Sequence, residues 1–151
     1  MNTLTNCTCA STWAEFAPLI LRVAIGMVFA YHGYDKLQKG VPMIASFLAS
    51  LGIPFPSFFA PILIAVELVG GMLMVLGFFT HWVAKLFIIV TTIAFLTVHM
   101  TKGFNVSKGG YEFIMTLFAA SVSLMITGAG KYSIDALFRK PDEQKRVNYS
   151  S

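Results

Sequence analysis

Long apolar stretches, each close to the length that crosses a bilayer, dominate this chain. They run over residues 15–35, 58–79, 82–100 and 111–127. About 20 predominantly apolar residues cross the roughly 30 Å hydrocarbon core as a helix, so the pattern predicts four membrane-spanning helices. Only Thr80 and His81 separate the second stretch from the third, which predicts a tight helical hairpin.

The connection between the first two stretches contains a shorter apolar segment, residues 41–51. Gly40 and Pro42 stand at its start, and a stretch with two prolines, residues 52–56, follows it. The segment is too short to span the membrane, so we expect it to lie in the interface or to dip in and return. It would then form a partial lid over one end of the bundle.

Composition agrees with a membrane protein. Of the 151 residues, 56% are hydrophobic and 12% are charged, which is more apolar than soluble domains. The predicted fold is an all-α, four-transmembrane-helix bundle with a short interfacial or re-entrant segment between the first two helices. Residues 1–14 form an N-terminal tail, residues 15–137 the membrane domain, and residues 138–151 a basic, disordered C-terminal tail.

Basic residues near the ends of the spans set the expected orientation. The side that holds the C-terminal tail carries the larger number of lysines and arginines, Lys85, Lys131, Arg139, Lys140, Lys145 and Arg146. The positive-inside tendency therefore places both termini in the cytoplasm. We expect the basic tail to be attracted to anionic lipid rather than to nucleic acid.

Two charged residues, Arg22 and Glu67, lie well inside the apolar stretches. A lone charge in hydrocarbon is costly, so such residues are usually paired and face the interior of a bundle. Depth estimates make an Arg22–Glu67 ion pair reasonable, with Gly70 and Gly71 allowing close helix contact. Two interpretations stay open: a structural clasp between two helices, or a carboxylate that handles protons.

A second polar group is expected on the loop side opposite the tail. Its members close the first and third helices and open the fourth, and they are His32, Lys36, His99, Tyr111 and Glu112. If their faces point inward, a polar pocket leads down toward Glu67; interfacial capping by amphipathic side chains is the alternative. No metal is predicted, because the Glu-x-x-His spacing of di-iron bundles is absent.

Several motifs occur in an order that resembles the DoxX family of small bacterial membrane proteins. They are Leu21-Arg22, His32-Gly33-Tyr34-Asp35-Lys36, Gly52-Ile53-Pro54-Phe55-Pro56, Glu67-Leu68-Val69-Gly70-Gly71, Gly110-Tyr111-Glu112 and Ser133-Ile134-Asp135. The likeness covers about residues 18–137. His81 and Ala129 depart from the family pattern, which leaves the hairpin side the least matched part.

The resemblance implies membrane redox work, because relatives are associated with quinone-linked oxidoreductases. It points to a subunit that binds a quinone and receives electrons from a partner. Glu67, His32 and Glu112 are the candidate catalytic residues, and Arg22, Lys36, His99 and Tyr111 the candidate ligand-binding residues. His32 or His99 would hydrogen-bond a quinone carbonyl, and Glu67 would relay a proton.

Two other functions remain open from the sequence. The chain could be a non-catalytic scaffold subunit of a membrane complex, or a carrier of small solutes or lipids. The expected location is the bacterial inner membrane, with membrane lipid, other membrane or redox subunits, or a second copy of the chain as partners. Glycine-bearing helix faces would suit such contacts. Cys7 and Cys9 receive no assigned role.

Overall fold

The computed structural model describes residues 13–138, and within this range all regular structure is helical. Residues 1–12 of the expected N-terminal tail, with Cys7 and Cys9, and residues 139–151 of the expected C-terminal tail lie outside the described residues. The predictions made for both tails therefore stay predictions. The all-α membrane fold is confirmed for the part between them.

The four apolar stretches all form helices. The first is α2, Ala17–Lys39, and the second is α4, Pro56–Leu76; the third is α5, Thr80–Ala94, prolonged by a π-helical segment, Phe95–His99, and a 3-10 turn, Met100–Lys102. Each of these three is long and apolar enough to cross a membrane. The fourth, α6, Glu112–Thr127, has 16 residues and an apolar composition. It is about 24 Å long, slightly shorter than the hydrocarbon core.

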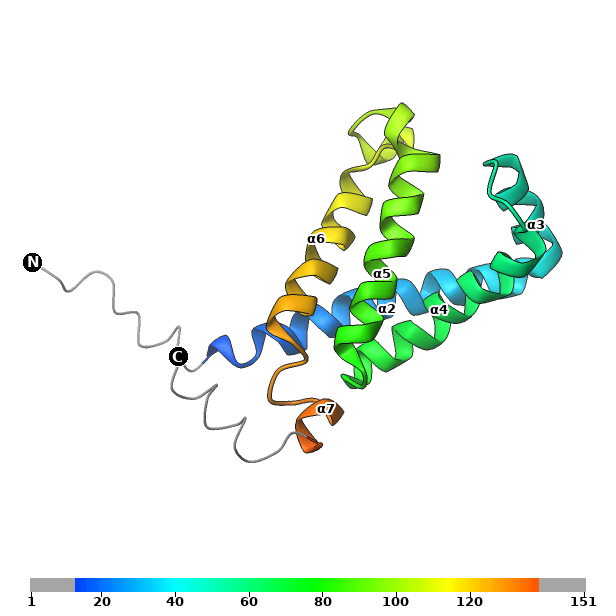
Figure 1. Ribbon diagram of the computed structural model, residues 1–151. Helices are drawn as coiled ribbons and strands as arrows, with labels where there is room; N and C mark the ends of the chain where they lie inside the picture. The colour runs from blue at the N-terminus through cyan, green and yellow to red at the C-terminus, as the bar shows by residue number, and fades with distance from the viewer. Residues whose placement is uncertain (1–12, 139–151) are drawn as a thin grey trace, which may run out of the picture.

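The short apolar segment in the first connection forms α3, Val41–Ser50. Its buried residues Ile44 and Leu48 pack on Ala60 and Ile64 of α4, which makes a small apolar cluster of its own. In Figure 1, α3 lies at the far end of α2 and α4, away from the connection between α5 and α6. The predicted lid therefore covers the α2–α4 hairpin rather than the end of the whole bundle.

The helices form two antiparallel pairs, α2 with α4 and α5 with α6, which are the most extensively packed neighbours. Figure 1 shows the two pairs meeting near α7, Ile134–Leu137, and diverging from there. The main core lies where they cross, and there the Phe29 and Phe87 rings stack with their centroids 3.6 Å apart. We call the side with the α4–α5 turn and α7 the closed end.

Candidate functional site

A buried ion pair joins α2 to α4 within the membrane-spanning segments. Lys36, near the end of α2, donates from Nζ to Oε2 of Glu67, which lies in the middle of α4. The Glu67 side chain is 7% exposed and the Lys36 side chain 21%. Because a single charge is costly in hydrocarbon, each side chain offsets the cost of burying the other.

Small residues set the register of the two helices that carry this pair. A methyl group at Gly33 would lie 2.7 Å from the Cα atom of Leu68, and one at Gly71 would lie 2.8 Å from that of Ala30. The two backbones are therefore in direct contact, as small residues permit at membrane helix interfaces. The role predicted for Gly71 is confirmed, whereas Gly70 faces the Phe87 ring of α5.

The predicted Arg22–Glu67 ion pair is wrong. In the register fixed by the contacts of Gly33 and Gly71, Arg22 is level with the α4–α5 turn. That position is about 18 Å along the helix axis from Glu67, at 1.5 Å per residue, which exceeds the reach of an arginine side chain. The depth estimate placed Lys36 level with the start of the second span, but α4 extends about 13 Å beyond the level of Lys36.

Arg22 lies at the closed end, where its side chain is 2% exposed. Its Nη1 donates to the Val75 carbonyl oxygen at 2.7 Å, and its Nη2 donates to the Tyr132 carbonyl oxygen. Its Nε has no hydrogen-bond partner within residues 13–138. The guanidinium group thus ties α2 to the last turn of α4 and to the segment that follows α6.

Asp135, which the sequence analysis named only as part of the Ser133-Ile134-Asp135 motif and gave no role, completes this arrangement. Its carboxylate accepts hydrogen bonds from the backbone N–H groups of Phe79 (2.8 Å) and Thr80 (2.9 Å), and its own N–H donates to the Gly77 carbonyl oxygen (2.9 Å). Phe79 has a φ of 53°, a left-handed conformation that costs energy for a bulky residue. The carboxylate stabilises this turn and caps α5. We call Arg22, Asp135 and their backbone partners the closed-end clasp.

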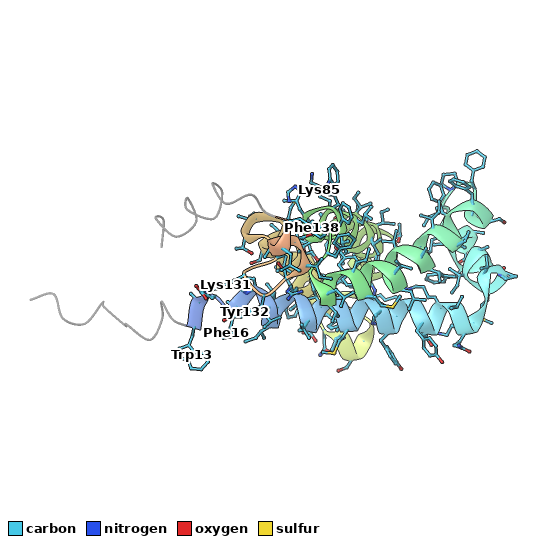
Figure 2. The ribbon with its side chains drawn as sticks, turned by 90° about the horizontal axis from the view of Figure 1, so that it is seen from below. Trp13, Phe16, Lys85, Lys131, Tyr132 and Phe138 are labelled. Atoms are coloured by element: carbon cyan, nitrogen blue, oxygen red, sulfur yellow. The ribbon has the colours of Figure 1, made fainter. Side chains whose placement is uncertain are left out.

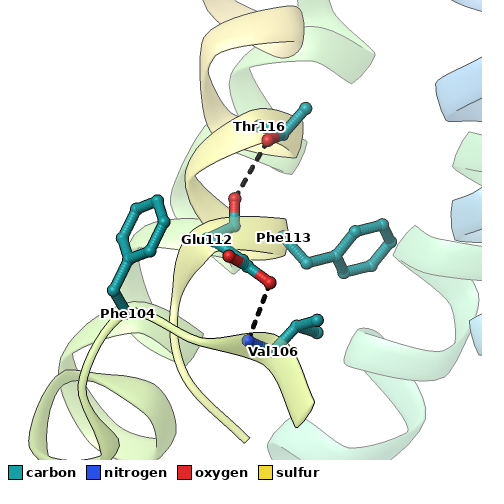
Figure 3. Close-up of a pocket in the computed structure, with 5 residues that line it drawn as sticks. All are labelled: Phe104, Val106, Glu112, Phe113 and Thr116. Atoms are coloured by element: carbon teal, nitrogen blue, oxygen red, sulfur yellow. Dashed lines mark hydrogen bonds between the residues drawn. The ribbon is translucent and has the colours of Figure 1, made fainter.

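Glu112 lies at the edge of a hollow of about 410 Å³ at the start of α6 (Figure 3). Its Oε1 accepts a hydrogen bond from the Val106 backbone N–H at 2.8 Å, and its carbonyl oxygen accepts one from the Thr116 hydroxyl at 2.9 Å. Its other carboxylate oxygen accepts no hydrogen bond from any described residue. The rings of Phe104 and Phe113 complete the lining.

A second hollow, of about 580 Å³, continues from the first along α6. The two share Phe104, Glu112 and Thr116, and the second reaches Leu21 of α2. The remaining lining side chains are mostly small or apolar, Met115, Ala119, Ala120 and Ser123. A groove with a polar head region and a mainly apolar continuation therefore follows α6.

His32 connects this groove to the buried ion pair. It is exposed on α2, and its ring lies 6.5 Å from the Phe113 ring, centroid to centroid. Lys36 is four residues further along the same helix and is therefore a neighbour of His32 on the helix surface. Phe113, which lines the hollow, thus contacts the helix that supplies the ammonium group of the Lys36–Glu67 pair.

The other candidates of the loop side do not join a single pocket above Glu67. His99 Nδ1 is 2.7 Å from the Gly109 carbonyl oxygen, so it holds the connection between α5 and α6. The Tyr111 ring packs edge-on against Phe95 and Phe104. His32, Lys36 and Glu67 belong to one hairpin and His99, Tyr111 and Glu112 to the other, and of these six residues only Glu112 lines either of the two hollows. Within the described part of the chain, no three His, Cys, Asp or Glu side chains gather as metal ligands do.

Comparison with known proteins gives a consistent picture. The family model described as DoxX matches residues 17–100. The chain is 34% identical to "Putative oxidoreductase CatD" of Bacillus subtilis over 134 residues, which are 89% of this chain and 96% of that protein. It is 33% identical to "Inner membrane protein YphA" of Escherichia coli over 78% of this chain and 86% of that protein.

A further relative from Escherichia coli, "Inner membrane protein YqjF", is 27% identical over 81% of this chain and 92% of that protein. No solved structure matches the chain. The family-model match, residues 17–100, includes both helices of the ion pair, α2 and α4.

Proposed function

Because this chain belongs to the DoxX family of membrane proteins, we propose that it is an oxidoreductase-associated subunit of the inner membrane that binds a quinone or a similar hydrophobic ligand. The observation that carries the proposal is the Lys36–Glu67 ion pair, together with His32, which is one helical turn from Lys36 and lies near Phe113 of the α6 groove. Ionisable residues inside membrane spans are rare, and they mark ligand or proton pathways more often than they mark packing alone.

The shape of the groove suits a quinone. The first hollow offers aromatic walls and a carboxylate for a polar head ring, and the second offers an apolar surface along α6 for an isoprenoid tail. Ligand sites are commonly this apolar, with a few polar groups that fix orientation. A hydrophobic ligand could enter sideways from the lipid, because much of α6 is exposed on the protein surface.

The residues have separate roles in this proposal. His32 donates an imidazole N–H to a carbonyl oxygen of the ligand at the Phe113 side of the hollow. Glu112 passes both protons of the reduction, one after the other, from water to the ligand through its second carboxylate oxygen, and the charges of the Lys36–Glu67 pair lie near this path. When bound, a quinone accepts two electrons and two protons and leaves as the quinol. A partner redox subunit supplies the electrons.

Among the relatives compared above, the support for a redox role is the name of one protein. The Bacillus subtilis relative carries the word oxidoreductase in its name, and the match covers 96% of its length. A scaffold role is the second candidate, because the closed-end clasp and the glycine contacts of α2 with α4 already give a rigid frame. A solute or lipid carrier is the third, and the groove along α6 is its only support within the described residues.

Orientation belongs to the proposal as well: both termini face the cytoplasm. Cys7 and Cys9 are the two cysteines of the chain and lie near its N-terminus. A membrane-impermeant maleimide should therefore leave intact spheroplasts unlabelled and label the protein once the membrane is permeabilised. Labelling in intact spheroplasts would place the N-terminus outside and contradict this orientation.

The function is tested by purifying the full chain in a mild detergent and extracting bound ligands for mass spectrometry. Wild-type protein should carry about one quinone per site, and Glu67→Gln and Glu112→Gln should lose it. Glu15→Gln is the matched control, because Glu15 lies at the closed end, pairs with Lys131 and lines neither hollow, so this variant should keep the quinone. Wild type without quinone, with unchanged partner subunits in Glu67→Gln, would leave the ion pair as a structural clasp and favour the scaffold role.

A further inference from the structure

Exposed and half-buried aromatic and lysine side chains gather at the closed end of the molecule on three separate segments (Figure 2). They come from the start of α2, the first turns of α5 and the segment after α6. We call this set the aromatic–lysine rim, and its members are Trp13, Phe16, Trp82, Lys85, Lys131 and Tyr132. Trp13 is 68% exposed, Trp82 63% and Tyr132 46%, so their rings are not used in the core.

The topology puts these side chains on one side of the membrane. The segment after α6 is in contact with both the start of α2 and the start of α5, so we place the rim residues of all three near one bilayer surface. Both tryptophans of the chain are in the rim. Tryptophan and tyrosine favour this level because their rings are amphipathic and suit the headgroup region.

The side chain of Lys85 extends toward the start of its helix, where the rim lies. Lys85 lies inside α5, more than one turn from the first residue, Thr80. Its Nζ nevertheless lies 4.3 Å from the centroid of the Trp82 ring, three residues nearer to the start of the helix. The side chain thus extends back toward the bilayer surface, as lysines near the ends of spans do, and a cation–π contact holds it there.

The second lysine of the rim, Lys131, is held by an ion pair rather than by an aromatic ring. Lys131 Nζ is 3.1 Å from Oε2 of Glu15, and the Tyr132 ring beside it stacks on Phe16 with centroids 5.0 Å apart. The hydrogen bond and the charge of Glu15 raise the pKa of Lys131, so its ammonium group stays charged at neutral pH. The side chain is 65% exposed and has room for a further acceptor.

We propose that the aromatic–lysine rim binds the headgroups of anionic phospholipids. Phosphate oxygens accept hydrogen bonds from Lys85 and Lys131, while the tryptophan and tyrosine rings lie among the glycerol and carbonyl groups. The charge suits this partner, because the acidic side chains at this end among residues 13–138 are already bonded, Glu15 to Lys131 and Asp135 to the α4–α5 turn. Basic residues beside a span attract anionic lipid in the same way. The proposal does not depend on quinone binding.

Tryptophan fluorescence reads the rim alone, because both tryptophans belong to it. The full chain is reconstituted into phosphatidylcholine vesicles that contain the same small fraction of either brominated phosphatidylglycerol or brominated phosphatidylcholine, with bromine near the top of the acyl chain. Bromine quenches tryptophan on contact. Brominated phosphatidylglycerol should quench more strongly, and the preference should fall roughly 5-fold for each lysine that is neutralised.

The variants distinguish the rim from a general charge effect. Lys85→Gln combined with Lys131→Gln should remove the preference for phosphatidylglycerol. The control combines Lys39→Gln with Lys108→Gln, which removes the same charge from the opposite end of the spans, and it should keep the preference. Quenching by brominated phosphatidylcholine confirms that each variant is inserted. Equal quenching by both lipids in wild type, or a preference that survives in the rim variant, would overturn the proposal.

Discussion

Replacing Lys36 with methionine should destabilise the protein more than replacing Glu67 with glutamine. The first change leaves a carboxylate that is 7% exposed and fixed in mid-helix without a partner. Breaking a buried ion pair costs about 3–5 kcal/mol, and the lower end applies because Lys36 is partly exposed. Glu67→Gln should cost about 1–2 kcal/mol, since the long Lys36 side chain can extend toward the bilayer surface.

The two changes should also be strongly coupled. With both charges removed no ion is left unpaired, so the double variant should be less destabilised than Lys36→Met alone. We expect a coupling energy of about 2 kcal/mol, measured by SDS titration of the purified variants with circular dichroism as the readout. Arg22→Gln combined with Glu67→Gln is the control and should be additive within about 0.5 kcal/mol. Additive costs for Lys36 and Glu67, or coupling of Glu67 to Arg22, would refute the helix register.

Two further predictions concern the frame around the sites, and thermal unfolding in detergent measures both. Gly33→Ala should prevent close contact of α2 with α4, because the added methyl group would collide with the backbone of Glu67 and Leu68. The cooperative thermal unfolding transition should therefore be lost. Gly70→Ala meets side-chain atoms of Phe87 and Val83 at 3.2 Å or more, and no backbone, so it should remain folded with a smaller loss of stability; similar behaviour of the two variants would argue against the contact. Asp135→Asn should cost about 1 kcal/mol by weakening the cap of α5. Asp35→Asn, which affects an exposed pair, should cost less than about 0.5 kcal/mol, and an equal loss in both would contradict a capping role for Asp135.

The helices could be predicted from the sequence because hydropathy and helix length are local properties. The apolar stretch at residues 58–79 corresponds to α4, Pro56–Leu76, and the hairpin at Thr80 and His81 is present as a short turn. The short segment at residues 41–51 also forms the expected separate helix. The length and apolar character of each stretch were enough to predict which segments span the membrane and which one is too short to do so.

Pairing between helices could not be predicted in the same way. The partner of Glu67 depends on the axial offset of α2 and α4, which Gly33 and Gly71 determine through backbone contact. A depth estimate from span ends cannot supply that offset. The cap by Asp135 was missed for a similar reason, since 55 residues separate it from Thr80 and neither neighbourhood carries a local signal.

Photolabelling with an azido-quinone tests the central claim, a ligand site between His32 and the α6 groove, most directly. Full-length protein in its native membrane is irradiated with the probe, digested and mapped by mass spectrometry, with and without excess unlabelled quinone. Our account predicts label within residues 28–36 and 104–116 that the competitor removes. Label that the competitor does not reduce, or that falls on α3 or the closed-end clasp, would contradict it.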